Sequence, residues 1–123
     1  MRPKYCKDVD LNQTFKTDRP IIGVVHLLPL PTSARWGGSL ATVIDRAEQE
    51  ATALASGGVD GIIVENFFDA PFVKERVDPA VVSAMTLIVQ RLKQLVTLPI
   101  GLNVLRNDAH SGLAIASCVQ AQF

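Results

Sequence analysis

Apolar residues recur along this chain in two alternating patterns, short continuous runs and longer stripes at helical spacing. The first run is Ile21–Val25, which is apolar on both faces, as in a strand buried on both sides. His26 closes it, and a loop rich in proline and glycine follows from 27 to 38. Ser39 is the expected N-cap of a helix that ends at Gly57-Gly58. The apolar stripe of that helix consists of Leu40, Val43, Ile44, Ala47, Ala51, Leu54 and Ala55.

The same order of elements repeats in the next stretch of the chain. Gly61–Val64 is a second apolar run, and Glu65 and Asn66 close it. Asp78-Pro79 then predicts a helix start, with a capping carboxylate followed by proline at the first helical position. The expected apolar stripe of this helix consists of Val82, Met85, Ile88, Val89, Leu92, Leu95 and Val96.

A third unit follows, and the beginning of a fourth. Pro99–Val104 predicts a strand, and either Asn107 or Asp108 is the expected cap of the next helix. The apolar positions of that helix are Leu113, Ile115, Ala116 and Val119. Residues 121–123 lie where a fourth strand would begin. Residues 1–19 are polar and aperiodic, which predicts an irregular leader.

Strand and helix alternate without interruption, which predicts an α/β fold with parallel strands and right-handed crossovers. An open sheet that binds a dinucleotide would carry G-x-G-x-x-G after its first strand, but His26–Pro31 occupies that position here. A TIM-type (β/α)8 barrel takes roughly 250 residues. The prediction for residues 20–123 is therefore the N-terminal half of such a barrel, about three βα units truncated at the fourth strand.

Composition narrows the classes of function. Hydrophobic residues make up 48% of the 123 residues, as in a packed domain. The net charge is zero with a pI near 6.7, which argues against nucleic acid as a partner. No apolar run reaches the roughly 20 residues of a transmembrane helix, and no apolar segment of a secretory signal follows the basic N-terminus. Two cysteines, Cys6 and Cys118, suit a reducing cytoplasmic compartment rather than a disulfide framework.

The carboxyl ends of the predicted strands carry the candidate chemistry, because barrel enzymes build their sites there. His26 and Glu65 are the candidate catalytic residues. A histidine at this position can be a general base, a metal ligand or a phosphate contact, or it can simply hydrogen-bond a loop carbonyl. A carboxylate after an apolar strand is costly to bury unless it has a role. The structural alternative for Glu65 is a salt bridge to Arg106.

Five further polar residues at the strand ends are candidates for substrate binding: Asn66, Asn103, Arg106, Asn107 and Asp108. Asparagine is depleted in strands, so Asn103 can reach a ligand or satisfy polar groups in the barrel core. Arg106 offers a planar fork for phosphate or carboxylate. Asp108, taken alone, fits a helix cap better. No cluster of Cys or His has metal-ligand spacing, and the sequence does not indicate which cofactor, if any, is bound.

Three blocks of this sequence resemble the BtpA family, also called the photosystem I biogenesis or BtpA/SgcQ family. They begin at Pro20 (PIIGVVHLLPLPTS), at Gly57 (GGVDGIIVEN) and at Pro99 (PIGLNVLRND), and the resemblance covers the chain from about residue 19 onward. It implies a TIM-type barrel like the ribulose-phosphate-binding barrels. It also implies a role in the accumulation and stability of photosystem I, as an extrinsic protein on the cytoplasmic face of the cyanobacterial thylakoid. Members from organisms without photosynthesis imply an older, enzymatic role.

The sequence departs from that family in lacking the C-terminal half of the barrel, where later loops often bind phosphate. A half barrel leaves a strand edge unpaired. Three explanations remain open: a truncated gene, a fragment, or a half that pairs with a second copy to close the barrel.

Three hypotheses on function follow. The first is a photosystem I biogenesis factor that associates peripherally with the membrane and binds photosystem I components or assembly factors, in which case the 27–36 loop matters more than Glu65. The second is a barrel enzyme for a small phosphorylated or sugar-like substrate, in which case Glu65→Gln abolishes turnover. The third is a fragment without activity.

Overall fold

The computed structural model describes residues 10–123, and the order of its elements follows the predicted βα repeats. The elements are α1 (Leu11–Phe15), β1 (Ile22–His26), α2 (Leu40–Ser56), β2 (Gly61–Glu65), α3 (Pro79–Leu95), β3 (Ile100–Asn103) and α4 (Ala109–Val119). The strands form one parallel sheet in the order β1-β2-β3. This confirms the α/β class with parallel strands.

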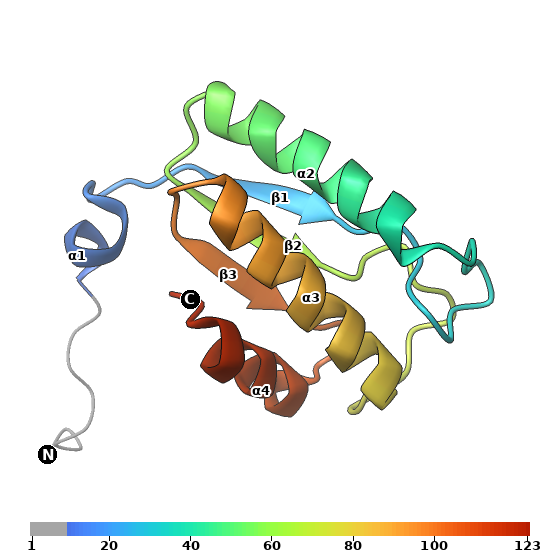
Figure 1. Ribbon diagram of the computed structural model, residues 1–123. Coiled ribbons are helices and arrows are strands. Elements are labelled where there is room, and N and C mark those ends of the chain that lie inside the picture. The colour runs from blue at the N-terminus through green and yellow to red at the C-terminus, as the bar shows by residue number, and fades with distance from the viewer. Residues whose placement is uncertain (1–9) are drawn as a thin grey trace, which may run out of the picture.

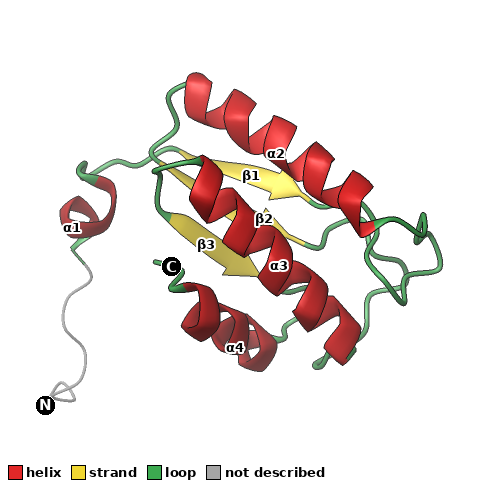
Figure 2. Ribbon diagram, viewed as in Figure 1, coloured by secondary structure: helices red, strands yellow, loops and turns green. Residues whose placement is uncertain are grey.

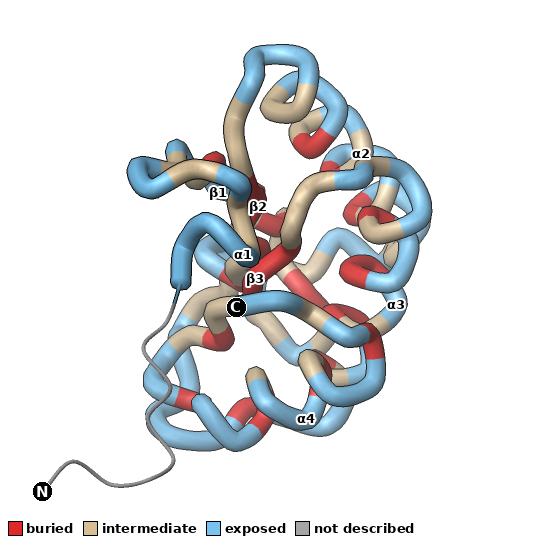
Figure 3. Tube along the Cα trace, turned by 90° about the vertical axis from the view of Figure 1, so that its left-hand side faces the viewer, coloured by how far each residue is buried: buried red, intermediate tan, exposed pale blue. Residues whose placement is uncertain are grey.

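Helices α2, α3 and α4 all cover the same face of the sheet (Figures 1 and 2). This one-sided layering is the arrangement of a segment of a βα barrel, in which helices lie outside and the other sheet face points inward. Figure 3 shows that the buried positions lie mainly between the strands and these helices. The core there includes Val25, Ile62, Val64 and Ile100 from the strands, all fully buried.

The helix starts confirm the capping predictions. The side chain of Ser39 accepts a hydrogen bond from the N–H of Thr42, and that of Asp78 accepts one from Ala80. Of the two caps proposed for the last helix, Asp108 is the one used. At the end of α2, Gly58 takes the left-handed conformation, with φ of +87°.

Two helical stripes differ from their predictions. In α3, Val81 is buried and Leu95 is 46% exposed, so the buried stripe starts one residue earlier than predicted and ends sooner. In α4, Leu113 is 71% exposed, while Ile115 and Val119 are buried. Leu113 lines a groove between β3, α4 and residues 121–123, and no further element covers it within residues 10–123.

The prediction of an irregular leader was wrong for residues 11–15, which form α1; residues 1–9 lie outside the described part. Asp10 caps this short helix. Its Phe15 ring lies over Gly61, on the sheet face that the long helices do not cover, and meets the ring of Phe123 edge to face at 5.0 Å between centroids. A Cβ at Gly61 would come within 2.7 Å of that Phe15 ring, so glycine is what allows this close approach.

Residues 121–123 run beside β3 without forming a regular strand. The N–H of Gln122 donates to the carbonyl of Ile100 at 2.8 Å, and the N–H of Leu102 donates to Phe123 at 3.1 Å. The chain therefore returns to the edge of the sheet where the fourth strand was predicted.

Candidate functional site

Parallel register brings three of the predicted residues into one row across the sheet. His26 is paired with Glu65, and Glu65 with Asn103, each as the last residue of its strand. Because side chains alternate along a strand, all three project to the same face. It is the face opposite the helices, since the preceding row of Val25, Val64 and Leu102 packs toward them. We call these three residues the rim row.

The carboxylate of Glu65 sits between its two neighbours in the rim row. Asn103 donates from Nδ2 to Oε1 at 2.8 Å, and Nε2 of His26 lies 3.4 Å from Oε2. The side chain of Glu65 is 18% exposed, and that of His26 is 39% exposed. Within residues 10–123 these are the polar partners of the Glu65 side chain. The alternative of a salt bridge between Glu65 and Arg106 is therefore not what the structure contains.

Two phenylalanines cover one side of the rim row. Phe67 stacks on the imidazole of His26 at 4.5 Å between centroids, with planes 26° apart. Phe68 meets the same imidazole edge-on at 6.0 Å. Both side chains follow the end of β2 and remain 47% and 41% exposed. These two residues were not among those predicted from the sequence, although two adjacent phenylalanines in a loop are themselves a signal, because a contiguous exposed apolar patch is typical of a contact surface.

Asn66 lies one residue beyond the rim row and points into the protein. It is 1% exposed. Its Oδ1 accepts from the N–H of Leu105 at 2.7 Å, and its Nδ2 donates to the carbonyl of Leu105 at 3.0 Å and to Asp69 at 3.1 Å. The amide thus ties the loop after β2 to the loop after β3. These contacts give Asn66 a structural role, in place of the predicted part in substrate binding.

Asp69 connects the same two loops to the loop after β1. Its carboxylate accepts from the N–H of Leu30 at 2.7 Å as well as from Asn66. Burial raises the pKa of the Asp69 carboxyl above its ordinary value of 3.8, and the two hydrogen bonds act in the opposite direction. Leu27 and Leu30 of the first loop are buried in the core. Two leucines of the apolar segment after His26 therefore pack into the core.

Asp108 also has a structural role. It is 2% exposed and accepts from the N–H of Val77 at 2.7 Å and from the N–H and Oγ of Ser111 at 2.9 and 2.6 Å. Burial pushes the pKa of its carboxyl upward, but the hydrogen bonds from Ser111 and Val77, with the nearby charge of Arg76, outweigh burial and hold the pKa below 3.8. Asp108 thus caps α4 and anchors the start of α3, as the structural alternative expected.

Arg106 and Asn107 are exposed on the loop after β3. The backbone of Arg106 accepts from Glu75 and donates to Val73, so this loop is fastened to the loop after β2. Asn107 has a positive φ of 62°. The rim row and these two residues thus lie at the same end of the sheet, but no side-chain hydrogen bond joins them within residues 10–123.

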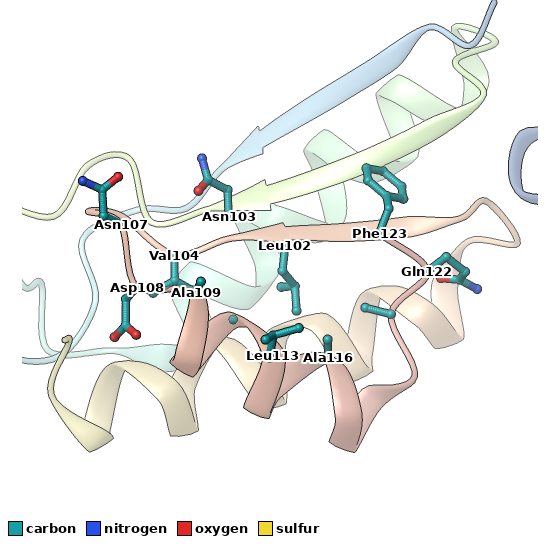
Figure 4. Close-up of a pocket in the computed structure, with 12 residues that line it drawn as sticks. Leu102, Asn103, Val104, Asn107, Asp108, Ala109, Leu113, Ala116, Gln122 and Phe123 are labelled. Atoms are coloured by element: carbon teal, nitrogen blue, oxygen red, sulfur yellow. The ribbon is translucent and has the colours of Figure 1, made fainter. Parts of the chain in front are cut away.

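A groove of about 620 Å³ lies between β3, α4 and residues 121–123. Asn103 and Asn107 line its polar end, and Leu102, Leu113 and Phe123 line the apolar remainder. Figure 4 shows Leu102 pointing toward α4, while Asn103 points away from that helix. Among the described residues, no group of three or more His, Cys, Asp or Glu side chains is placed to hold a metal ion.

Comparisons with known proteins show which proteins this chain is similar to. A model described as the BtpA family matches residues 17–123. The chain is 80% identical to "Photosystem I biogenesis protein BtpA" of Synechocystis over 94% of its own length and 40% of that protein. It is 49% identical to an uncharacterised protein of Archaeoglobus fulgidus, and 33% identical to "Putative sgc region protein SgcQ" of Escherichia coli, spanning 42% of each. No solved structure gives a significant match. The chain thus spans about 40% of the length of these curated relatives.

Proposed function

This chain belongs to the BtpA family, and we propose that it serves the biogenesis and stability of photosystem I. The observation that carries the proposal is the 80% identity to the Synechocystis protein of that name. Such identity over 94% of the chain supports a shared fold and a shared role. Because the match spans 40% of that protein, the role proposed is that of the corresponding N-terminal part acting within a longer protein.

The proposed location is the cytoplasmic face of the thylakoid membrane, with photosystem I components or their assembly factors as partners. Among residues 10–123, no helix has the length and hydropathy to span a membrane. The loop after β2 offers a contact surface, because four of its apolar side chains are exposed. They are Phe67, Phe68, Phe72 and Val73, with exposed fractions of 40 to 51%. This apolar loop, rather than the 27–36 segment whose Leu27 and Leu30 are buried in the core, is the surface we assign to partner contact.

A chimera tests the proposal. The matching N-terminal part of the Synechocystis protein is replaced by this chain, in cells that lack the native protein. Photosystem I content is measured by the light-induced oxidation of its reaction-centre chlorophyll. The expected result is restoration of photosystem I to the level given by the native protein. A chimera that accumulates normally while photosystem I stays at the level of the deletion strain would overturn the proposal.

The rim row supports a second candidate function, a barrel enzyme acting on a small phosphorylated or sugar-like substrate. The specific observation is a carboxylate that is held between an imidazole and an amide at the carboxyl ends of three adjacent strands. That is where barrel enzymes place proton-transfer groups. In this role His26 and Glu65 handle protons, and Asn103 and Arg106 orient the substrate.

Two variants of the chimera separate the candidates. Glu65→Gln removes the negative charge in nearly the same volume, whereas Phe72→Ser changes the exposed apolar loop at a side chain that is 40% exposed and is not stacked on His26. If enzymatic activity at the rim row is what supports photosystem I, Glu65→Gln lowers photosystem I content and Phe72→Ser does not. If partner contact is what matters, the effects are reversed. Immunoblotting for the chimera keeps loss of function apart from loss of the protein.

A further inference from the structure

The surroundings of the His26 ring are asymmetric. One ring nitrogen, Nε2, faces the Glu65 carboxylate at 3.4 Å. Within residues 10–123, the other nitrogen, Nδ1, makes no hydrogen bond. One ring face is covered by Phe67, which limits rotation of the imidazole about its side-chain bonds. The two nitrogens therefore experience different electrostatic environments, and the ring is held in the orientation that makes them different.

The orientation of the carboxylate is also fixed. A carboxylate only accepts hydrogen bonds, so the amide group of Asn103 must turn its nitrogen toward Glu65. This bond engages Oε1 and leaves Oε2 as the oxygen nearest the imidazole. A neutral imidazole that placed its lone pair at Nε2 would set that lone pair against a negative oxygen. Placing the proton on Nε2 turns the same contact into an attraction.

We infer that Glu65 is a positioning residue which keeps the proton of His26 on Nε2, so that the lone pair of Nδ1 is the general base of the rim row. The inference rests on the second candidate function above, and it assigns the two acid-base residues different roles. The more exposed imidazole reaches the substrate, at 39% exposure, and the 18% exposed carboxylate acts through it.

The proton balance follows from this arrangement. Nδ1 takes a proton from an acidic O–H or C–H group of the substrate, and the substrate keeps the electron pair of the broken bond. The imidazole becomes an imidazolium whose positive charge lies against the Glu65 carboxylate, which stabilises it. Returning the same proton to the product restores the neutral ring, with its remaining proton on Nε2.

The tautomer of His26 can be measured without knowing the substrate. The chain has two histidines, so His110→Gln leaves His26 as the source of the only imidazole signals. Nitrogen-15 chemical shifts of the ring, recorded at alkaline pH where the imidazole is neutral, report which nitrogen carries the proton. The expected result in this background is a ring protonated almost entirely on Nε2.

Glu65→Gln supplies the discriminating comparison. Because Asn103 donates toward Oε1, the new amide places its oxygen there and turns its NH₂ toward Nε2 of His26. An amide donor favours a lone pair on Nε2, so the tautomer ratio is expected to shift by at least about tenfold toward Nδ1–H. The matched control is Glu75→Gln, which removes an equal charge from the loop after β2, from a side chain that is 79% exposed and paired only with Lys74 within residues 10–123. It is expected to leave the ratio unchanged.

Two outcomes would overturn the inference: a ring protonated mainly on Nδ1 in the parent, or a ratio that Glu65→Gln leaves unchanged. Failure of the underlying function gives a different result. In that case the tautomer responds as expected, but His26→Asn and Glu65→Gln both leave photosystem I content intact in the chimera.

Discussion

Replacing Asp108 with alanine tests whether this residue holds the fold together or belongs to the site. Its carboxylate is 2% exposed and accepts three hydrogen bonds, from the N–H of Val77 and from the N–H and Oγ of Ser111. Asp78 is the natural comparison, because it also caps a helix. Asp78 is exposed, and its side chain accepts one hydrogen bond, from the N–H of Ala80 at 2.8 Å.

The expected loss in the free energy of unfolding follows from the hydrogen-bond donors that each substitution leaves without an acceptor. Asp108→Ala leaves two backbone N–H groups and one hydroxyl without their acceptor, and each buried unsatisfied donor costs about 1–3 kcal/mol. Allowing for relaxation and water entry, the expected loss in the free energy of unfolding is about 3–5 kcal/mol. Asp78→Ala removes an exposed cap, for which the loss is about 1 kcal/mol. Since small domains are stable by about 5–15 kcal/mol, only the first change threatens the fold.

Urea unfolding followed by far-ultraviolet circular dichroism measures both losses. With a slope of about 1–3 kcal/mol/M, the midpoint is expected to fall by more than about 1 M for Asp108→Ala and by less than about 1 M for Asp78→Ala. Equal losses in the two variants, within about 0.5 kcal/mol, would refute the structural role derived for Asp108. In that event its predicted place in substrate binding would regain support.

The pH dependence provides a second check on the same residue. Because the pKa of folded Asp108 lies below its ordinary value of 3.8, the unfolded state binds more protons at acidic pH. The stabilisation by the carboxylate is therefore complete above 3.8 and is lost as the pH falls through the folded pKa. The difference in unfolding free energy between the parent and Asp108→Ala should shrink over that acidic range and stay constant near neutrality.

Three further changes have distinct expected outcomes. Asn66→Ala removes the buried amide that pairs with both backbone groups of Leu105, and should lower the urea unfolding free energy by about 2–4 kcal/mol. Gly23→Ala places a Cβ about 2.7 Å from a Leu54 methyl between β1 and α2, and the overpacking should cost about 1–3 kcal/mol in the same assay. Arg91→Ala removes the exposed ion pair between Arg91 of α3 and Glu48 of α2, and should lower the free energy of unfolding by less than about 1 kcal/mol. A larger loss in thermal or urea unfolding would contradict the view that this exposed pair contributes little to stability.

Much of the fold could be predicted from local pattern. Continuous apolar runs predicted the three strands to within a residue or two. The expected burial of both strand faces is not what residues 10–123 show, because the long helices cover one face and Val24 on the other is 39% exposed. Asp78-Pro79 located the start of α3, because a cap followed by proline is a strictly local signal. The predicted apolar stripe of α4 was less accurate, since Leu113 is 71% exposed. Exposure there depends on which elements neighbour the sheet, and the spacing of apolar residues does not carry that information.

The candidate site was likewise predictable only in part. The sequence by itself determined that polar residues end each strand, and parallel topology then required them to share one end of the sheet. Only the tertiary structure decided which of them meet. Register placed Glu65 between His26 and Asn103, whereas Asn66, the next residue along, projects to the opposite face and became a buried tie between loops. The physical reason is that side chains alternate along a strand, so a shift of one residue exchanges the open face for the core.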